Sequence, residues 1–374
     1  MAPEVKKGIP GYCVEKVDDT GPPFHQKIGD FLSTTSPSIS IVTACYNSTP
    51  FLDRIYESLG KQTYRNFEWV CVDDASPDDT VARLISLKSP GALGMQVYKL
   101  PQNTGGPVAL GVGTQRARGD IVIWLDHDDA LEPFALEQVR NNWWRAQADE
   151  SVSGMLFWAI DAADGRPIGR HLPPGTKLTW SEQNNRYPDI CDCTFAFKRE
   201  QLQRFATVEA MEDVILNGVV FERMTAAHPF VTADGPPIRY YFRDNPASQT
   251  RLERISRKTV ATYARLLDQS DLHYVRSPMR WLKHAATLLR YSRIVHGRWL
   301  YGLRYISRAG IRILLLALLP FGLVAYLRRP NANIVDAPFF PAHLADGLDD
   351  LWLGDRAQDR PSSPEIVATP RPVI

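Results

Sequence analysis

The sequence predicts an α/β fold in which a mainly parallel β-sheet is flanked by helices. Runs of β-branched and apolar residues alternate with segments whose apolar residues recur at helical spacing. Acidic clusters follow two of the apolar runs, at the position where such sheets bind ligands. The chain has 374 residues, of which 44% are hydrophobic, which is enough to bury a sizeable core.

The first half of the chain carries the more regular pattern. Strands are predicted over residues 38–47, 67–76, 95–100 and 120–125. Helices are predicted over residues 48–62, 78–87 and 105–119, with Pro50 suited to a first helical position. This alternation favours parallel strands joined by helices.

The second half is less regular. Its predicted elements are a helix over residues 134–147, a strand and helix over 191–205, a helix over 211–227 and a strand from residue 238. We expect four regions: an N-terminal arm over residues 1–37, a catalytic domain over 38–255, a basic helical region over 256–330 and a Pro-rich, acidic, disordered tail over 331–374.

The cysteines and the N-terminus indicate the compartment. The five cysteines are odd in number, and Cys191 and Cys193 lack the second ligand pair of a zinc site. We therefore expect reduced thiols. The N-terminus has no apolar core of a secretory signal. Together these features predict a cytoplasmic location.

Charge is distributed asymmetrically. Residues 272–335 hold eleven Lys and Arg and no Asp or Glu, although the whole chain has a net charge of only +1. Such a block predicts contact with something anionic. The apolar stretch over residues 311–327, as one straight helix of ~26 Å, is shorter than a ~30 Å hydrocarbon core. Interleaved basic and aromatic residues favour a helix lying on an anionic membrane surface, with a short span or a core helix as alternatives. No nucleic acid is expected, because nothing else in the chain reads bases.

Three carboxylates follow the predicted strand over residues 120–125, namely Asp126, Asp128 and Asp129. Two carboxylates at this spacing can bind one divalent cation, and Mg²⁺ or Mn²⁺ is held by one or two carboxylates together with substrate phosphates. The alternative is capping of the next helix, for which one carboxylate, such as Asp129, suffices. Three carboxylates therefore favour a metal site.

Asp73 and Asp74 end another predicted strand, either as turn residues or as acceptors for a nucleoside. These clusters, in this order and spacing, resemble glycosyltransferase family 2, whose members use nucleotide sugars and have the GT-A fold. The resemblance covers residues 38–250 and implies a Rossmann-like sheet with Mn²⁺ or Mg²⁺ bound at an Asp-x-Asp motif, Asp126 and Asp128. It further implies donor binding by Ala44, Tyr46, Asn47, Asp74, Asn103, Asp126 and Arg243.

The resemblance also implies a catalytic base, for which Asp213 is the best match and Glu212 stands beside it. An inverting transfer requires a carboxylate that takes the proton of the acceptor hydroxyl as it attacks the anomeric carbon. The alternative is that the two acids simply favour a helix N-terminus. Asn245 stands where members often carry a metal-ligating His, and its amide oxygen can still ligate. Leu110 and Gly111 replace an Arg-Asn pair that members usually have.

These features predict a metal-dependent, inverting glycosyltransferase, peripheral on the cytoplasmic face of the membrane, that acts in cell-envelope or exopolysaccharide synthesis. It would move a sugar from a nucleotide-diphosphate donor, with a UDP-sugar favoured, to a hydroxyl of a lipid-linked glycan acceptor. Transfer to a polyprenyl phosphate, nucleotidyl transfer and an inactive glycan- or membrane-binding relative are the alternatives. Ser277 occupies the Gln position of the processive Gln-x-x-Arg-Trp motif, which favours transfer of single residues.

Overall fold

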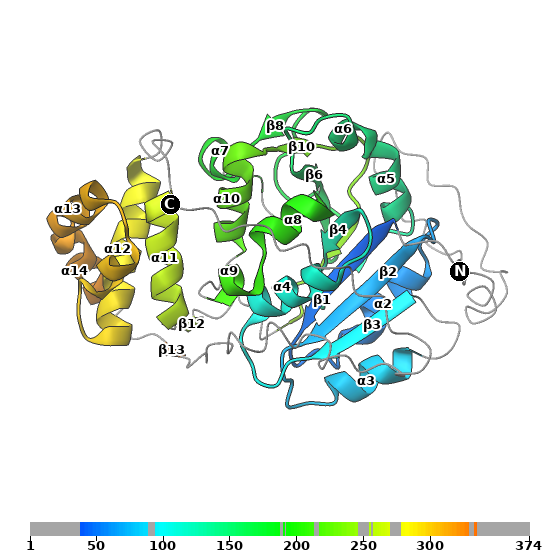
Figure 1. Ribbon diagram of the computed structural model, residues 1–374, viewed down its shortest axis with the longest axis horizontal. Coiled ribbons are helices and arrows are strands. Elements are labelled where there is room, and N and C mark those ends of the chain that lie inside the picture. Colours follow the sequence, from blue (N-terminus) through cyan, green and yellow to red (C-terminus); the bar gives the residue numbers. More distant parts are fainter. Residues whose placement is uncertain are drawn as a thin grey trace, which may run out of the picture.

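An eight-stranded sheet organises the first two thirds of the computed structural model, in the order β3-β2-β1-β4-β9-β6-β10-β8 (Figure 1). The described residues are 38–88, 94–187, 190, 192–212, 217–245, 254–255, 257–269, 278–328 and 333–334. The predicted N-terminal arm and nearly all of the predicted tail lie outside them.

The strands of this sheet are short and mostly buried. They are β1 (Ile39–Cys45), β2 (Phe67–Asp73), β3 (Gly94–Lys99), β4 (Ile121–Trp124), β6 (Gly154–Phe157), β8 (Lys177–Leu178), β9 (Thr194–Lys198) and β10 (Phe230–Thr232). β3, β2, β1 and β4 pair in parallel, whereas β9 runs antiparallel to both β4 and β6. The prediction of a mainly parallel sheet is therefore confirmed, and its parallel half comes from the regular first half of the sequence.

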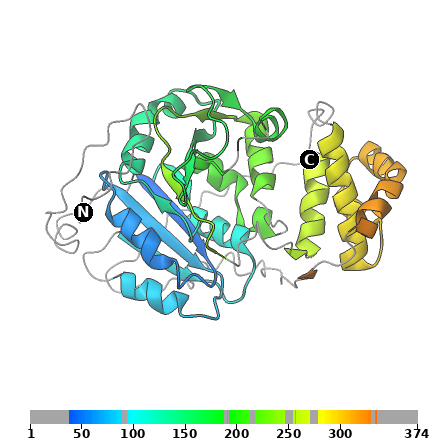
Figure 2. The same ribbon diagram turned by 180° about the vertical axis from the view of Figure 1, so that it is seen from behind.

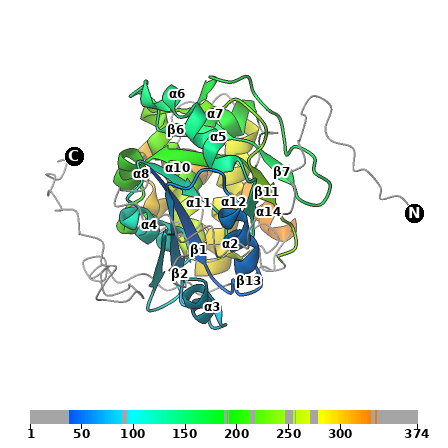
Figure 3. The same cartoon turned by 90° about the vertical axis from the view of Figure 1, so that its right-hand side faces the viewer.

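Helices cover both faces of the sheet. They are α2 (Leu52–Gly60), α3 (Thr80–Leu87), α4 (Gly106–Arg116), α5 (Ala135–Asn142), α6 (Trp144–Gln147), α7 (Trp180–Arg186), α8 (Arg199–Phe205), α9 (Val208–Glu212) and α10 (Gly218–Ala227). Successive strand side chains point to opposite faces. Ile41 of β1 packs in one core cluster with Leu52 of α2, and Val42 packs in another with Val108 of α4. Figure 3 shows α2 and α4 on opposite sides of β1.

One local prediction was wrong. Helix α2 begins at Leu52 with Phe51 as its cap residue, so Pro50 precedes the helix instead of opening it. Of the helix predicted over residues 211–227, the described residues belong to the end of α9, at Glu212, and to α10, which begins at Gly218; residues 213–216 lie outside the described residues.

A second, three-stranded sheet was not predicted. It consists of β5 (Ala130–Leu131), β11 (Arg239–Tyr241) and β7 (Ala159–Asp161), in the order β5-β11-β7. Since β5 directly follows the acidic cluster at the end of β4, this sheet brings β11 from far along the chain to that cluster.

The basic region folds into a helical unit. Its elements are α11 (Arg257–Gln269), α12 (Pro278–His296), η2 (Tyr301–Tyr305), α13 (Ala309–Ala317) and α14 (Leu319–Arg328), next to the paired strands β12 (Arg254–Ile255) and β13 (Asn333–Ile334). Val260, Leu288 and Leu315 share its core cluster. Figures 1 and 2 show this unit at the end of the molecule opposite β2 and β3. In the described part of the chain, no helix is long and apolar enough to cross a membrane.

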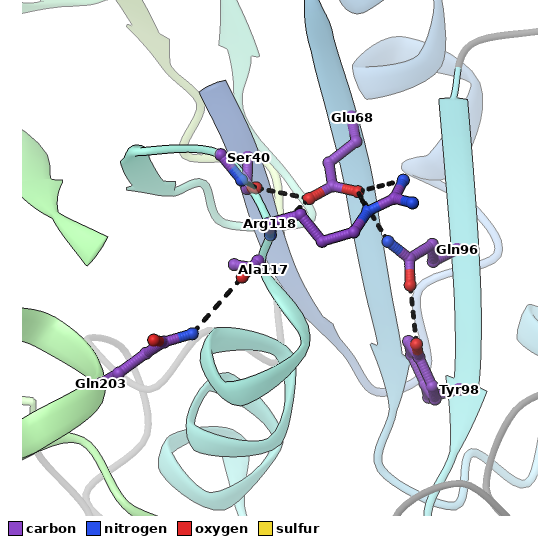
Figure 4. A network of polar contacts seen from close by, with 8 residues as sticks. Ser40, Glu68, Gln96, Tyr98, Ala117, Arg118 and Gln203 are labelled. Carbon is purple, nitrogen blue, oxygen red and sulfur yellow. Dashed lines mark hydrogen bonds and ion pairs between the residues drawn. The ribbon is translucent and has the colours of Figure 1, made fainter. Parts of the chain in front are cut away.

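The edge of the sheet where the parallel strands begin is closed by a buried polar network (Figure 4). Glu68 of β2 is 1% exposed. Its carboxylate accepts hydrogen bonds from Ser40 Oγ at 2.6 Å, Gln96 Nε2 at 2.6 Å, and Arg118 N and Nε at 2.7 and 2.8 Å. Gly119 N donates to Ser40 Oγ at 2.8 Å, and a Cβ on Gly119 would lie 2.6 Å from Ser40 N. The network thus ties β1, β2, β3 and the entry to β4 together.

Candidate functional site

The candidate site lies at the opposite edge, where β1, β2 and β4 end. Asp74 N donates to the Cys45 carbonyl at 2.8 Å, and Leu125 N donates to the Val42 carbonyl at 3.0 Å. These bonds extend the parallel pairing past the strand ends and bring the residues after all three strands to one crevice. This is the position at which parallel α/β sheets bind ligands.

Asp129 is held inside the protein. Its side chain is 1% exposed, accepts from Arg239 Nη1 at 2.6 Å and accepts from Phe242 N at 3.0 Å. Burial raises the pKa of the Asp129 carboxyl, and the Arg239 guanidinium opposes that shift. The α5 helix that follows is capped by Phe134 without a side-chain hydrogen bond, so the alternative in which Asp129 caps it is wrong.

Asp126 and Asp128 are less buried than Asp129. Asp126 is 68% exposed and lies 3.7 Å from Arg239 Nη1. Asp128 is half-buried and accepts from Asn245 Nδ2 at 2.7 Å. The structure thus brings Asp128 and Asn245 together as predicted, although 117 residues separate them. A rotation of the Asn245 amide would present its oxygen in place of its nitrogen.

These side chains can supply part of the ligand shell of a magnesium or manganese ion. Within the described ranges, no group of three or more His, Cys, Asp or Glu side chains is arranged to hold a metal ion. Asp126 and Asp128 offer carboxylate oxygens, and such ions complete their shells with water and substrate phosphate. The donor set therefore suits a cation that is bound jointly by protein and ligand.

Arg54 of α2 fixes this loop, a role that was not predicted. Its Nη1 donates to the Asp128 carbonyl at 2.7 Å. Its guanidinium lies 3.8 Å from the centre of the Phe242 ring and forms an ion pair with Asp244. Arg54 consequently joins the Asp-x-Asp turn to the segment that carries Asn245.

The end of β1 forms the next wall of the crevice. Tyr46 is 36% exposed, and Asn47 has a φ of 52°, a left-handed conformation that Asn tolerates better than most residues. Asn47 N donates to Ser76 Oγ at 3.1 Å. His127 Nδ1 lies 3.2 Å from the Ala44 carbonyl oxygen, so the residue between the two metal-site carboxylates contacts the predicted nucleoside wall.

Asp74 organises a loop. It is 1% exposed, and its carboxylate accepts from Thr104 N at 2.7 Å, Thr104 Oγ1 at 2.9 Å and Gly105 N at 2.7 Å. Gly105 has a φ of 100°, which favours glycine. The half-buried Asn103, also predicted to bind the donor, is carried by this loop.

Arg243 lies apart from the carboxylate pair. It is 60% exposed, and its Nε is 2.9 Å from Asp161 Oδ2 at the end of β7. Of the two acids predicted for catalysis, Glu212 is the last residue of α9, and Asp213 falls outside the described residues.

Leu110 and Gly111, which replace the Arg-Asn pair usual in the resembled family, pack in the protein interior. Leu110 is 6% exposed and belongs to the core cluster that also contains Met211. A Cβ on Gly111 would lie 3.1 Å from Met211 Cγ. In this chain the two positions therefore pack α4 against α9, the helix that leads to the predicted base.

Comparisons with known proteins agree with this geometry. Residues 40–205 match the model of the family described as glycosyl transferase family 2. TuaG of Bacillus subtilis, a candidate teichuronic acid biosynthesis glycosyltransferase, is 26% identical over 151 residues, which are 40% of this chain and 58% of TuaG. The poly(ribitol-phosphate) β-N-acetylglucosaminyltransferase TarS of Staphylococcus aureus is 31% identical over 136 residues, which are 36% of this chain and 22% of TarS.

The matched segment thus spans less than two thirds of either relative. The crystal structure of S. aureus TarS 1–349 in complex with UDP-GlcNAc superimposes with a TM-score of 0.52 and 16% identity, covering 82% of this chain and 99% of that chain. At this identity the likeness concerns the fold. The fold is thus of the GT-A type, and residues 40–205 are similar in sequence to glycosyltransferase family 2.

Proposed function

We propose that the protein is a metal-dependent, inverting glycosyltransferase that uses a UDP-sugar and extends a cell-envelope glycan at a hydroxyl group. One observation carries the proposal: the Asp-His-Asp-Asp turn buries Asp129 against Arg239 but leaves Asp126 68% exposed and Asp128 half-buried. Carboxylates left in this way at a strand end suit a cation that is shared with a diphosphate.

The residues around the crevice would divide the work. Asp126 and Asp128, with the Asn245 amide, would hold Mg²⁺ or Mn²⁺, which supplies charge stabilisation for the departing diphosphate. Tyr46 and Asn47 would bound the nucleoside, and Asp74 would fix the loop that presents Asn103. Arg54, through the Asp128 carbonyl, and Arg239, through Asp129, would hold the turn that carries the metal-binding carboxylates.

The acceptor hydroxyl requires a base on the far side of the sugar from the leaving group. Asp213 is proposed for this role, because α9 ends at Glu212 and its Met211 packs directly against α4. Arg243, paired with Asp161, is proposed to lie beside the acceptor or the sugar and not beside the nucleoside.

The relatives suggest the class of acceptor. The names of TarS and TuaG place those proteins in the synthesis of anionic cell-wall polymers, and the TarS structure contains UDP-GlcNAc. We propose a UDP-sugar and a growing, lipid-linked envelope glycan at the cytoplasmic membrane face for this chain, with Arg243 facing a polyanionic acceptor.

Turnover of UDP-sugars with Asp213→Asn tests the assignment. The variant should lose transfer by about 10²–10⁴-fold, the usual contribution of a general base, while its affinity for UDP stays within twofold of the wild type. Glu212→Gln is the matched control and should retain most transfer. Full transfer by Asp213→Asn would refute the base and would fit a phosphate acceptor, whose oxyanion needs no deprotonation.

A further inference from the structure

Helices α13 and α14 lie on the side of the helical unit that faces away from the eight-stranded sheet (Figures 1 and 2). This surface is apolar: Ile313 is 67% exposed, Leu316 44%, Phe321 52% and Leu327 66%. Outside residues 300–327, the large exposed hydrophobic side chains of the described chain are Tyr46, Ile85 and Trp144, which lie on separate segments. Large apolar side chains exposed together on two successive helices mark an interaction site.

The helix geometry shows that the exposure is not a consequence of poor packing. Leu315 of α13 is 0% exposed and lies in the core of the helical unit. At 100° per residue, Ile313, Leu314 and Leu316 fall on the opposite arc of the same helix. The helix thus has a filled inner face and a separate apolar outer face.

We propose that this outer face of α13 and α14 docks on an anionic lipid membrane. Charge selects this partner. Arg312 of α13 is exposed, as are Arg298 and Arg304 in the segment before it, and residues 272–335 contain no acidic side chain. A second copy of the chain would bring like charges together, whereas anionic headgroups beside acyl chains complement both the arginines and the apolar side chains.

The same geometry specifies how the helices lie. The apolar stretch over residues 311–327 breaks at Leu318 into helices of nine and ten residues. Each is ~14–15 Å long at 1.5 Å per residue, about half of a ~30 Å hydrocarbon core. They would therefore lie in the interface with their outer faces immersed, without crossing the membrane.

Docking would also orient the catalytic half. Leu266 of α11 belongs to the same core cluster as Val219 of α10, so the helical unit is packed onto the helix that follows the predicted base. Only the role of docking, which would hold the crevice near a lipid-linked acceptor, rests on the proposed function. The docking itself can be tested separately.

Sedimentation of the full chain with phosphatidylcholine vesicles, with and without phosphatidylglycerol, tests the proposal. The wild type should sediment with the anionic vesicles, and its partition coefficient should fall at least tenfold in Ile313→Glu/Leu316→Glu/Leu327→Glu. Arg298→Gln/Arg304→Gln should lower it severalfold and weaken its salt dependence. Ile85→Glu/Trp144→Glu, which adds acids at exposed apolar positions elsewhere, is the matched control and should bind like the wild type.

Two readouts separate the possible failures. Thermal unfolding and UDP binding of each variant, measured without vesicles, show whether the fold and the donor site are intact. Unchanged sedimentation of the triple variant would overturn the proposal. So would a wild type that ignores anionic vesicles and forms a dimer that the triple variant loses, because the surface would then bind a second copy.

Discussion

The two edges of the parallel half-sheet both carry buried or half-buried acids, yet they use them in opposite ways. At the edge where the strands begin, Glu68 is 1% exposed and is satisfied by Ser40, Gln96 and Arg118. At the edge where they end, Asp126 is 68% exposed and lies 3.7 Å from Arg239 Nη1. The first arrangement is complete without a ligand, whereas the second, in the proposed function, is completed by a cation and a diphosphate.

The comparison also shows how a structural acid stands within four residues of the two acids proposed to bind a ligand. Asp129, like Glu68, accepts hydrogen bonds from an arginine and from a backbone N–H. Its neighbours Asp126 and Asp128 do not. Burying one carboxylate firmly fixes the turn that holds the other two outward, which is the preorganisation that a binding site needs.

The largest loss of stability is expected from breaking the buried Arg239–Asp129 pair, which resembles the Glu68 network although it lies at the edge where the strands end. Arg239→Met leaves the Asp129 carboxylate buried without its cation, and breaking such a pair costs about 3–5 kcal/mol. Urea unfolding should show this loss, together with weaker UDP binding. Arg239→Met/Asp129→Leu removes both charges and should recover most of the stability but not the binding. A loss below about 1 kcal/mol in the single variant would mean that the pair is not structural.

Glu68→Gln is expected to have a smaller effect, confined to stability. The neutral amide cannot accept all the donors that converge on Glu68, and unsatisfied buried groups cost about 1–3 kcal/mol. The midpoint of urea unfolding should fall while UDP affinity stays unchanged. Glu57→Gln, at a side chain that is 66% exposed, is the matched control and should change little. Reduced UDP affinity in Glu68→Gln would show that the two edges are not independent.

Asp78→Asn should have the smallest effect, and that effect should depend on pH. Partial burial raises the pKa of Asp78, but hydrogen bonds from Thr80 and Thr49 outweigh it and lower the pKa below its ordinary value. A lowered pKa in the folded state stabilises the protein above the unfolded value of ~3.9, and the gain is lost as the pH falls through the folded value.

The measurement is the difference in unfolding free energy between the wild type and Asp78→Asn. It should be about 0.5–1.5 kcal/mol at neutral pH and should shrink as the pH falls below ~4. A difference that stays constant down to acid denaturation would show that the Asp78 carboxylate is not stabilised by its charge.

The sequence predicted the parallel half of the fold because its buried strands, such as β4 (Ile-Val-Ile-Trp), form apolar runs. It also singled out Asp128 and Asn245 as partners at one site, and the structure joins them by a hydrogen bond. The second sheet escaped prediction, since β5 has two residues and β7 three, too few for a periodic signal.

The supporting arginines could not be predicted for a different reason. Arg239 meets Asp129 across 110 residues, and Arg54 meets Asp244 across 190. Nothing local distinguishes either arginine from a solvated one. Their roles depend on which strands pair in the second sheet, and that is decided by tertiary packing rather than by the surrounding sequence.

The central claim is that Asp126 and Asp128 hold a donor diphosphate through a divalent cation. Thermal stabilisation by UDP, with Mn²⁺ and again with EDTA, tests it most directly in the wild type, Asp128→Asn and Glu68→Gln. At a hundredfold excess over Kd, binding adds about 2.7 kcal/mol of stability. The account predicts this gain with Mn²⁺ in the wild type and Glu68→Gln, and its loss with EDTA or in Asp128→Asn. Equal stabilisation of all three proteins, with or without metal, would contradict it.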